Sequence, residues 1–380
     1  MASGVEVRQV AAPPERTRFV RLPWALYQGD PHWVPPLRSA VDSLLDVSRN
    51  PFFEHGECTL FLACRGGQPV GRVAAIIDHA HNQRFAESTG FWGFFETVND
   101  FEVAAALLDA AGDHLRGRGM TVMRGPFNPN INGECGLLVD GFDSMPFVLM
   151  PYNPPYYPRL VARAGFIRHM DLYAYYVRSD QVAPHLPTMK RFERLAAAIR
   201  TRHPGLSVRH IDMTRYDDEV LTFGRLFNAA RSENWGFVPM TDDEIRAMAR
   251  AMKPIVDPGL VIACDLDGEP VGCIMGIPDV SPALKKMNGR LFPFGWLHFL
   301  LGKRRAHTCR IFGAGTLPEY RHAGVTILLI LEYIRRSLYA GYDAGEVSWV
   351  AASNVRSLGV IEKALQLARY KTYRIYEREL

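Results

Sequence analysis

Short apolar runs alternate with longer segments in which apolar residues recur every three or four positions, a pattern that indicates a mixed α/β protein. The runs at residues 59–64 and 70–77 flank a Gly-Gly turn, which predicts a β-hairpin. Behind Asp100, the apolar positions of residues 103–115 keep helical spacing, which predicts a helix capped by that carboxylate. The first half of the chain is therefore expected to form one domain of strands and helices.

The hairpin pattern recurs in the second half of the chain. Residues 260–264 and 271–277 repeat it with one residue inserted in the turn, and they share its Ala-Cys and Pro-Val-Gly sequences. Upstream, residues 32–35 (HWVP) are echoed by residues 234–239 (NWGFVP). Two repeats in the same order argue for duplication, and a period of about two hundred residues is too long for a solenoid. We expect two α/β domains, at 1–178 and 206–380, joined by a linker at 179–205 that contains three prolines and a mixed helix at residues 189–201.

Composition narrows the classes of function. The net charge of +4 arises from 44 basic and 40 acidic residues, a balance that does not indicate nucleic-acid binding. Six cysteines without a C-x-x-C pair are typical of a reducing compartment, and no signal peptide or long apolar run is apparent, so a cytoplasmic location is predicted. His79 and His81 lack a third ligand in the sequence pattern, so we predict no metal site.

Residues 312–326 (FGAGTLPEYRHAGVT) carry the strongest candidate chemistry, because they predict a strand, a glycine-rich turn and the start of a helix. Small residues at a helix N-terminus leave backbone N–H groups open to an anion such as phosphate. The following helix has no acidic residue in its first turn, carries Arg335 and Arg336 near its end, and is expected to stop at Gly341.

This turn resembles motif A of the GNAT acyltransferase superfamily, in which Arg321, Gly324 and Thr326 fill the characteristic positions. The resemblance implies that acyl-coenzyme A is held here. The cofactor contacts that it implies are Gly315, Leu317, Arg321, His322, Ala323, Gly324, Val325 and Thr326. Thr326 departs from the Gly or Ala of the family, and its methyl group could crowd the pyrophosphate or its hydroxyl could donate to it.

The resemblance extends over the second copy, through a strand at 346–350, a terminal strand at 370–376, and Asn354 and Ser357 between them. It implies two GNAT-like domains in tandem, each a mixed, mostly antiparallel sheet flanked by helices. By the same resemblance Asn354 and Ser357 would reach the pantetheine or its phosphates, although helix capping explains Asn354 equally well. The first copy has no such turn before its helix, so only the second copy is expected to bind coenzyme A.

Transfer of an acyl group to an amine needs a proton acceptor and donors to the oxyanion, and it needs no covalent intermediate. The family places the thioester between two splayed strands, which makes Glu346 the candidate base or amine-orienting carboxylate. Alternation along that strand puts Glu346 and Ser348 on one face, so both are predicted catalytic residues. A surface ion pair is the alternative role for Glu346.

Residues 125–128, 136–143 and 370–376 give the whole chain a resemblance to the tandem GNAT proteins that include the bacterial ceramide synthases, which N-acylate a sphingoid base. The FemX-like tandem enzymes are a rival, but their helical arm is not visible here. Two other hypotheses remain: an N-acetyltransferase of a small soluble amine, and a non-catalytic acyl-CoA-binding protein. Candidate contacts for the acceptor amine lie in turn-rich or aromatic segments: Asn128, Asn132, Glu134, Tyr152, Asn153, Trp235 and Trp296.

Residues 291–305 combine eight large apolar side chains with Lys303, Arg304 and Arg305. The segment is too short to span a bilayer. It is expected either to lie in the interface of an anionic membrane, which would make the protein peripheral at the inner membrane, or to cover the sheet as a packed helix.

Overall fold

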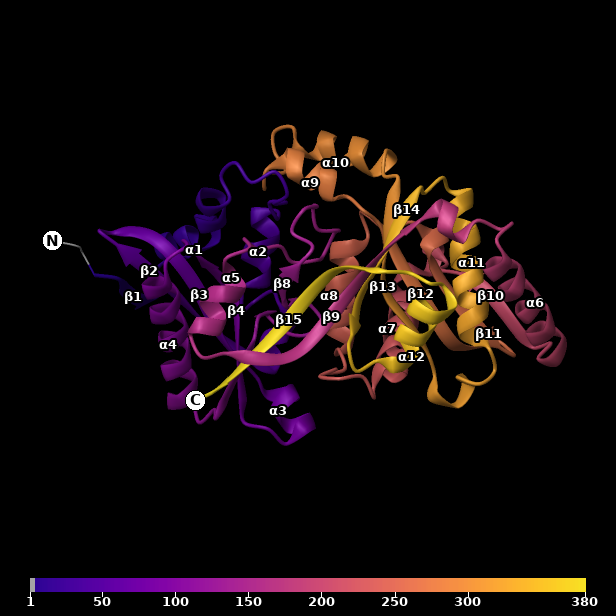
Figure 1. Cartoon of the computed structure of the whole chain (residues 1–380), viewed down its shortest axis with the longest axis horizontal. Helices are drawn as coiled ribbons and strands as arrows, with labels where there is room; N and C mark the ends of the chain where they lie inside the picture. Colours follow the sequence, from indigo (N-terminus) through magenta and orange to yellow (C-terminus); the bar gives the residue numbers. More distant parts are fainter. Residues whose placement is uncertain (1–3) are drawn as a thin grey trace. The chain divides into compact units, whose positions relative to one another are not determined.

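The computed structural model describes residues 4–380, so residues 1–3, where the first predicted domain begins, lie outside it. The chain divides into two units (Figure 1). Unit 1 comprises the residues up to Leu172 together with Ser281–Phe299 and Lys371–Leu380, and unit 2 comprises Tyr173–Val280 and Leu300–Tyr370. Two long strands, β9 (Ile167–Arg178) and β15 (Arg369–Glu379), each run from one unit into the other.

Unit 1 is built on a sheet whose strands follow the order β1-β2-β3-β4-β5-β15, with β8 also paired to β15. Its other strands are β1 (Glu6–Gln9), β2 (Gly56–Arg65), β3 (Gln68–Asp78), β4 (Thr89–Thr97), β5 (Val122–Gly125), β6 (Phe127–Asn128), β7 (Glu134–Cys135) and β8 (Leu137–Asp140). Its helices are α1 (Pro13–Leu26), α2 (Arg38–Leu44), η1 (Pro51–Glu54), α3 (His79–Phe85), α4 (Phe101–Gly117), α5 (Tyr157–Arg163) and α9 (Ser281–Met287).

The core of unit 1 lies between α4 and the sheet. Leu107, Leu108 and Leu115 are fully buried on one stripe of α4 and pack in one cluster with Trp92 of β4. The carboxylate of Asp100 accepts a hydrogen bond from the backbone N–H of Glu102 at 2.9 Å, so the expected helix cap is present.

Unit 2 is built on the strand order β9-β14-β13-β12-β11-β10. Its further strands are β10 (Leu206–His210), β11 (Val261–Leu266), β12 (Glu269–Pro278), β13 (Thr308–Thr316) and β14 (Ala344–Ala351). Its helices are η2 (Ser179–Val182), α6 (Pro187–Arg202), η3 (Met213–Arg215), α7 (Tyr216–Arg231), α8 (Asp242–Met252), η4 (Pro258–Leu260), η5 (Pro318–Tyr320), α11 (Val325–Tyr339), α12 (Val355–Leu358) and the π-helix η6 (Gly359–Ala364). Helix α10 (Gly295–Arg304) begins in unit 1 and ends in unit 2.

The two units repeat one plan, as the duplicated hairpins predicted. In each, two antiparallel hairpin strands lead to a third strand that pairs in parallel with a fourth, β4 with β5 and β13 with β14. The hairpins even share a β-bulge, at Ala63/Cys64 in one and at Cys264/Asp265 in the other. The predicted α/β class with mixed, mostly antiparallel sheets is confirmed.

The predicted linker at residues 179–205 differs from the structure, which places most of it in a helix of unit 2. Met189, Phe192 and Ala196 of α6 are buried in the same hydrophobic cluster as Leu328 and Leu329 of α11. Their spacing of three and four residues gives α6 one apolar face, and burial of that face holds the helix against its neighbour. Pro187 is the first residue of this core helix.

Candidate functional site

The parallel strands β13 and β14 of unit 2 pair only over their first halves. The register runs from Thr308 opposite Ala344 to Ile311 opposite Val347, whereas β13 continues to Thr316 and β14 to Ala351. Beyond Ile311 the two strands separate. An opening between two strands leaves backbone N–H and C=O groups without a ladder partner, so it can accept an extended ligand.

A β-bulge lies on the other edge of β13 at the same point. Gly313 pairs with Met275 and Ile311 pairs with Gly276 of β12, so Phe312 is the extra residue. A bulge re-aims the backbone groups of the extra residue away from the ladder. The backbone N–H of Phe312 is therefore a candidate donor to a carbonyl oxygen held between the separating strands.

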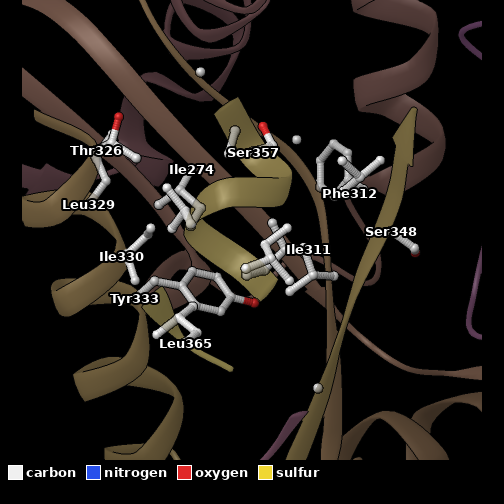
Figure 2. Close-up of a pocket in the computed structure, with 18 of the residues that line it drawn as sticks. Ile274, Ile311, Phe312, Thr326, Leu329, Ile330, Tyr333, Ser348, Ser357 and Leu365 are labelled. Carbon is white, nitrogen blue, oxygen red and sulfur yellow. The ribbon is translucent and has the colours of Figure 1, made fainter. Parts of the chain in front are cut away.

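A cavity of about 830 Å³ follows this opening within unit 2. Figure 2 shows Thr326 and Leu329 of α11, Ser357 of α12, and Phe312 and Ser348 of the separating strands around it. The predicted site residues that line the cavity are Trp235, Gly315, Arg321, Thr326, Glu346, Ser348, Asn354 and Ser357. Five others that belong to the same turn are not among the lining residues: Leu317, His322, Ala323, Gly324 and Val325.

One end of the cavity is the N-terminus of α11. Gly324 caps the helix with φ +80°, and a Cβ at this position would collide with Ile199, so the turn requires glycine. The N–H of Ile327 bonds Gly324 O at 3.0 Å, and the N–H groups of Val325 and Thr326 come before it in the first turn, ahead of the helical ladder. These groups and the helix dipole suit a phosphate.

The side chains of Thr326 and Arg321 also line the cavity at the N-terminus of α11. The Thr326 hydroxyl lines the cavity and lies 3.1 Å from the Thr316 hydroxyl, so its oxygen is held by a side-chain partner. The Arg321 guanidinium is bonded to the Glu233 carboxylate at 2.5 Å and also lines the cavity. Glu233 lines the cavity as well, so an anionic ligand at the open N–H groups would share the Arg321 guanidinium with this carboxylate.

Asn354 has the capping role that was one of its two predicted alternatives. Its side chain accepts a hydrogen bond from the backbone N–H of Ser357 at 3.1 Å, at the start of α12. Both residues also line the cavity, so the cap itself forms part of the wall.

Glu346 lies at the strand opening, buried with 1% of its surface exposed. Its carboxylate accepts hydrogen bonds from the hydroxyls of Ser348 and Tyr370. Arg310, directly opposite on β13, donates from Nε to the Ser348 hydroxyl at 2.8 Å and lies 3.7 Å from Glu346 Oε1. The predicted alternative of a surface ion pair does not apply, because Glu346 and Arg310 are both buried.

The arrangement around Glu346 holds a carboxylate in one orientation beside a cation and two hydroxyls. Such a group can accept the proton of an incoming amine, and the buried Arg310 stabilises its charged form. Tyr370 was not predicted as a site residue. Its position in the terminal strand, 24 residues after Glu346, gives no local signal of the contact.

The cysteines of the cavity wall are not set up as nucleophiles. Burial raises the pKa of the Cys273 thiol to about 12 and that of Cys309 to about 11. A thiol with such a pKa carries almost no thiolate at neutral pH. This agrees with direct transfer between two bound substrates.

The part of the cavity that extends along α11 has a mostly apolar wall. Its lining includes one stripe of that helix: Thr326, Leu329, Ile330, Tyr333, Ile334, Ser337 and Leu338. From the first to the last of these residues the helix rises about 18 Å at 1.5 Å per residue. Ile361, Leu365 and Leu367 belong to the wall as well, and Figure 2 shows Leu365 beside Tyr333. Sequence reasoning missed this wall, because apolar residues at helical spacing look the same whether they line a cavity or fill a core.

The remaining predicted acceptor residues lie in unit 1. Asn128 accepts from the Phe94 N–H at 2.7 Å, and Asn153 accepts from the Leu138 N–H at 2.7 Å. These two amides therefore hold backbone segments in place. Tyr152 donates to the Asp30 carboxylate at 3.1 Å.

Three further predicted acceptor residues of unit 1 are placed as follows. Asn132 belongs to the segment between β6 and β7, Glu134 is the first residue of β7, and Trp296 is 45% exposed on α10. None of these six side chains lines the cavity of unit 2 described above.

The described residues show neither a metal-binding cluster nor a membrane-spanning helix. Residues 4–380 contain no group of three or more His, Cys, Asp or Glu side chains placed to hold a metal ion. Within the same residues, no helix has both the length and the apolar character needed to cross a bilayer.

Two repeated α/β units, with a glycine turn at a helix start beside strands that separate at a bulge, define a tandem GNAT acyltransferase. Solved structures share this fold. A tandem GNAT protein from the clavulanic acid biosynthesis pathway matches with a TM-score of 0.58 and 14% identity, over 99% of this chain and 98% of that one. A GCN5-related N-acetyltransferase from Sphaerobacter thermophilus matches with a TM-score of 0.54 and 12% identity, over 99% and 95%.

Two curated proteins have higher sequence identity to this chain than these solved structures do. The bacterial ceramide synthase of Caulobacter vibrioides is 36% identical over 383 residues, covering 99% of this chain and 98% of that protein. Protein YghO of Escherichia coli is 33% identical, covering 95% and 92%. No family model matches the chain. The chain belongs to the family of the bacterial ceramide synthase, and it is an acyltransferase.

Proposed function

We propose that the protein transfers a long-chain acyl group from coenzyme A to the amine of a sphingoid-type lipid base. The observation that carries the proposal is the apolar cavity of about 830 Å³ in unit 2, which continues from the strand opening along the whole of α11. An acetyl group needs only a small pocket, whereas a long acyl chain needs an extended apolar wall of this kind. The Caulobacter relative, named a ceramide synthase, supports the amine and lipid class.

The acyl donor is proposed to bind with its pyrophosphate at the N-terminus of α11. The N–H groups of Val325 and Thr326 and the guanidinium of Arg321 supply donors and positive charge there. Asn354 and Ser357 on α12 are proposed to border the pantetheine. The thioester would then lie between the separating strands, where the Phe312 N–H can donate to the oxyanion that forms.

The reaction is proposed to be direct aminolysis. The amine nitrogen attacks the thioester carbonyl carbon, the new C–N bond forms and the amine proton passes to the Glu346 carboxylate. The C–S bond then breaks, and the departing thiolate of coenzyme A takes up the proton from Glu346, which returns to its carboxylate form. Ser348 and Arg310 hold Glu346 in place for this transfer through their hydrogen bond at 2.8 Å and their contacts with the carboxylate.

We propose that unit 1 does not bind coenzyme A, because the corresponding helix start is already occupied. At the N-terminus of α4, the Asp100 carboxylate bonds the Glu102 N–H at 2.9 Å and the Arg65 guanidinium at 2.8 Å. A second anion would be repelled there. A cytoplasmic location is also proposed, in keeping with six cysteines that are all free thiols.

The proposal is tested with the purified protein, sphinganine as acceptor, and acetyl-, octanoyl- and palmitoyl-CoA as donors. Palmitoyl-CoA is expected to give the highest kcat/KM. Ile334→Trp, which would fill the middle of the α11 stripe, should lower kcat/KM for palmitoyl-CoA by at least about tenfold and leave acetyl-CoA turnover within a few-fold. Preference for acetyl-CoA with soluble amines would instead identify a small-molecule N-acetyltransferase. Binding of coenzyme A without turnover of any amine would identify a non-catalytic protein.

A further inference from the structure

The segment between α9 and β13 carries a concentrated set of exposed apolar side chains. Phe292 is 73% exposed, Phe294 is 69% exposed, and Trp296 is 45% exposed. Of sixteen large hydrophobic residues that are exposed in residues 4–380, seven lie in this segment: Leu291, Phe292, Phe294, Trp296, Leu297, Leu300 and Leu301. Scattered single exposures are ordinary on a protein surface, but a contiguous group marks an interaction site.

Helix α10, drawn in orange in Figure 1, lacks the polar face of an ordinary surface helix. Between Gly295 and Gly302 its only polar side chain is His298. A helix that is apolar around most of its circumference is normally buried in a protein core or in a membrane. Of its ten residues only Gly295 is buried, so the packed helix that was the alternative expectation is not what the structure shows.

The exposed segment is fixed at both ends. Before it, Trp24 donates from Nε1 to Asn288 Oδ1 at 2.9 Å, and the Arg38 N–H bonds Gly289 O at 3.1 Å, within unit 1. After it, Lys303 donates to Pro254 O at 2.7 Å within unit 2. The exposed side chains therefore belong to a segment whose two ends are anchored by hydrogen bonds, and not to a loose chain end.

The charge of the segment points to an anionic partner. From residue 280 to residue 307 the chain carries six Lys or Arg residues and no Asp or Glu. The rest of the chain then has 38 basic against 40 acidic residues, so the entire positive excess of the protein lies here. Docking of two copies through this surface would bring like charges together, which disfavours a symmetric dimer.

We propose that residues 288–305 dock on an anionic lipid bilayer. Phe292, Phe294 and Trp296 enter the headgroup layer, where aromatic rings are favoured, and Arg304 and Arg305 meet the lipid phosphates. A helix of ten residues is about 15 Å long, so it lies in the interface instead of crossing the bilayer. The inference goes beyond the proposed reaction, because docking requires neither acyl-CoA nor turnover.

Vesicle co-sedimentation tests the proposal with the full chain and no acyl-CoA. Vesicles of phosphatidylglycerol mixed with phosphatidylcholine should bind the protein, pure phosphatidylcholine vesicles should bind it at least about tenfold more weakly, and added salt should release it. The variant Phe292→Ser/Phe294→Ser and the variant Arg304→Glu/Arg305→Glu should each lose at least about tenfold in binding. Because these side chains are exposed, melting temperatures should stay near the wild-type value.

Two matched variants control for loss of apolar surface and of charge elsewhere. Val47→Ser/Tyr339→Ser removes exposed apolar side chains, and Arg191→Glu/Arg194→Glu reverses exposed charges on α6. Both should bind vesicles like the wild type. Absence of wild-type binding, equal loss in a control, or a concentration-dependent dimer abolished by Phe292→Ser/Phe294→Ser would each overturn the proposal. Acyl transfer to a detergent-solubilised acceptor is measured separately, so failure of docking is distinguished from failure of the reaction.

Discussion

Arg310 and Glu346 occupy directly opposite positions on the parallel strands β13 and β14, with Arg310 Nε 3.7 Å from Glu346 Oε1. The next pair, Ile311 and Val347, is the last before the strands separate. The carboxylate is thus fixed at the edge of the opening, where an acyl group and an amine could meet. Ordered placement of this kind lets a buried carboxylate act without reorganising during the reaction.

Replacing the carboxylate by its amide tests its role. Glu346→Gln keeps the shape of the side chain but cannot accept a proton, so turnover should fall by about a hundredfold or more while acyl-CoA still binds. Turnover is measured by product formation and donor binding by calorimetry. Glu269→Gln, an exposed change at the first residue of β12, is the control and should have no effect. Near-normal turnover of Glu346→Gln would remove Glu346 from the mechanism.

A negative charge at the start of α11 should prevent donor binding. Thr326→Asp places a carboxylate in the first helical turn, where it would repel the pyrophosphate yet favour the helix dipole by about 0.5 kcal/mol. Affinity for coenzyme A should therefore fall at least about tenfold with no loss of melting temperature. Thr326 is a better position for this test than Gly324. Any side chain at Gly324 would collide with Ile199, so a loss of binding could not be separated from a loss of folding.

Removing the charge at the corresponding helix start of unit 1 should leave donor binding unchanged. Asp100→Asn keeps the cap on α4 and removes its charge, so affinity for coenzyme A should be unchanged. A clear change in affinity would show that unit 1 takes part in donor binding.

The raised pKa of Glu96 in unit 1 predicts that the stability of the protein depends on pH. Burial raises the pKa of the Glu96 carboxyl, and Arg72 opposes this shift only in part, as do the hydroxyls of Tyr157 and Tyr27, while Glu134 adds to it. The folded state therefore holds the proton more tightly than the unfolded state. The stabilisation is present below the unfolded pKa of about 4.3 and is lost as pH rises through the raised folded value.

The comparison with Glu96→Gln isolates this effect, because the amide does not titrate. As pH rises from about 4 towards neutrality, the melting temperature of the wild type should fall relative to that of the variant. Melting curves at a series of pH values measure the difference. Parallel dependence in the two proteins would show that Glu96 titrates with an ordinary pKa.

The cavity cysteines should be dispensable. With a pKa of about 12, Cys273 carries about one thiolate in ten thousand at pH 8, so it is a poor nucleophile. Cys273→Ala and Cys309→Ala should keep turnover within a few-fold, and iodoacetamide should label neither thiol rapidly in the folded protein. In urea all six free thiols should react. Rapid labelling of one thiol that abolishes activity and is prevented by acyl-CoA would instead indicate a covalent step.

Features set by neighbouring residues could be predicted from the sequence alone. The hairpins of β2–β3 and β11–β12 follow from apolar runs that flank glycine turns, and α4 begins where Asp100 supplies a cap. The turn before α11 was also predictable, because Gly324 and the small residues around it are contiguous. In each case, the backbone preference is decided within a few residues of the position.

Features that depend on distant segments were decided only by the tertiary structure. The family resemblance implied two splayed strands, but the sequence does not show that β13 and β14 separate after Ile311, because strand pairing depends on which backbones meet. Nor does it show that Tyr370 bonds Glu346, or that Ile334 and Leu365 share one wall of a cavity. An apolar side chain has the same local pattern whether it fills a core or lines a binding site.

Helices α6 and α10 show that the local sequence does not determine whether an apolar face is buried. The apolar face of α6 lay in a stretch predicted as a linker, and it is buried against α11. The apolar residues of α10 could equally have covered the sheet, and they are exposed. Local sequence determined that both segments could form helices. Burial depends on the surface that each helix meets, and that surface is assembled from residues far away in the chain.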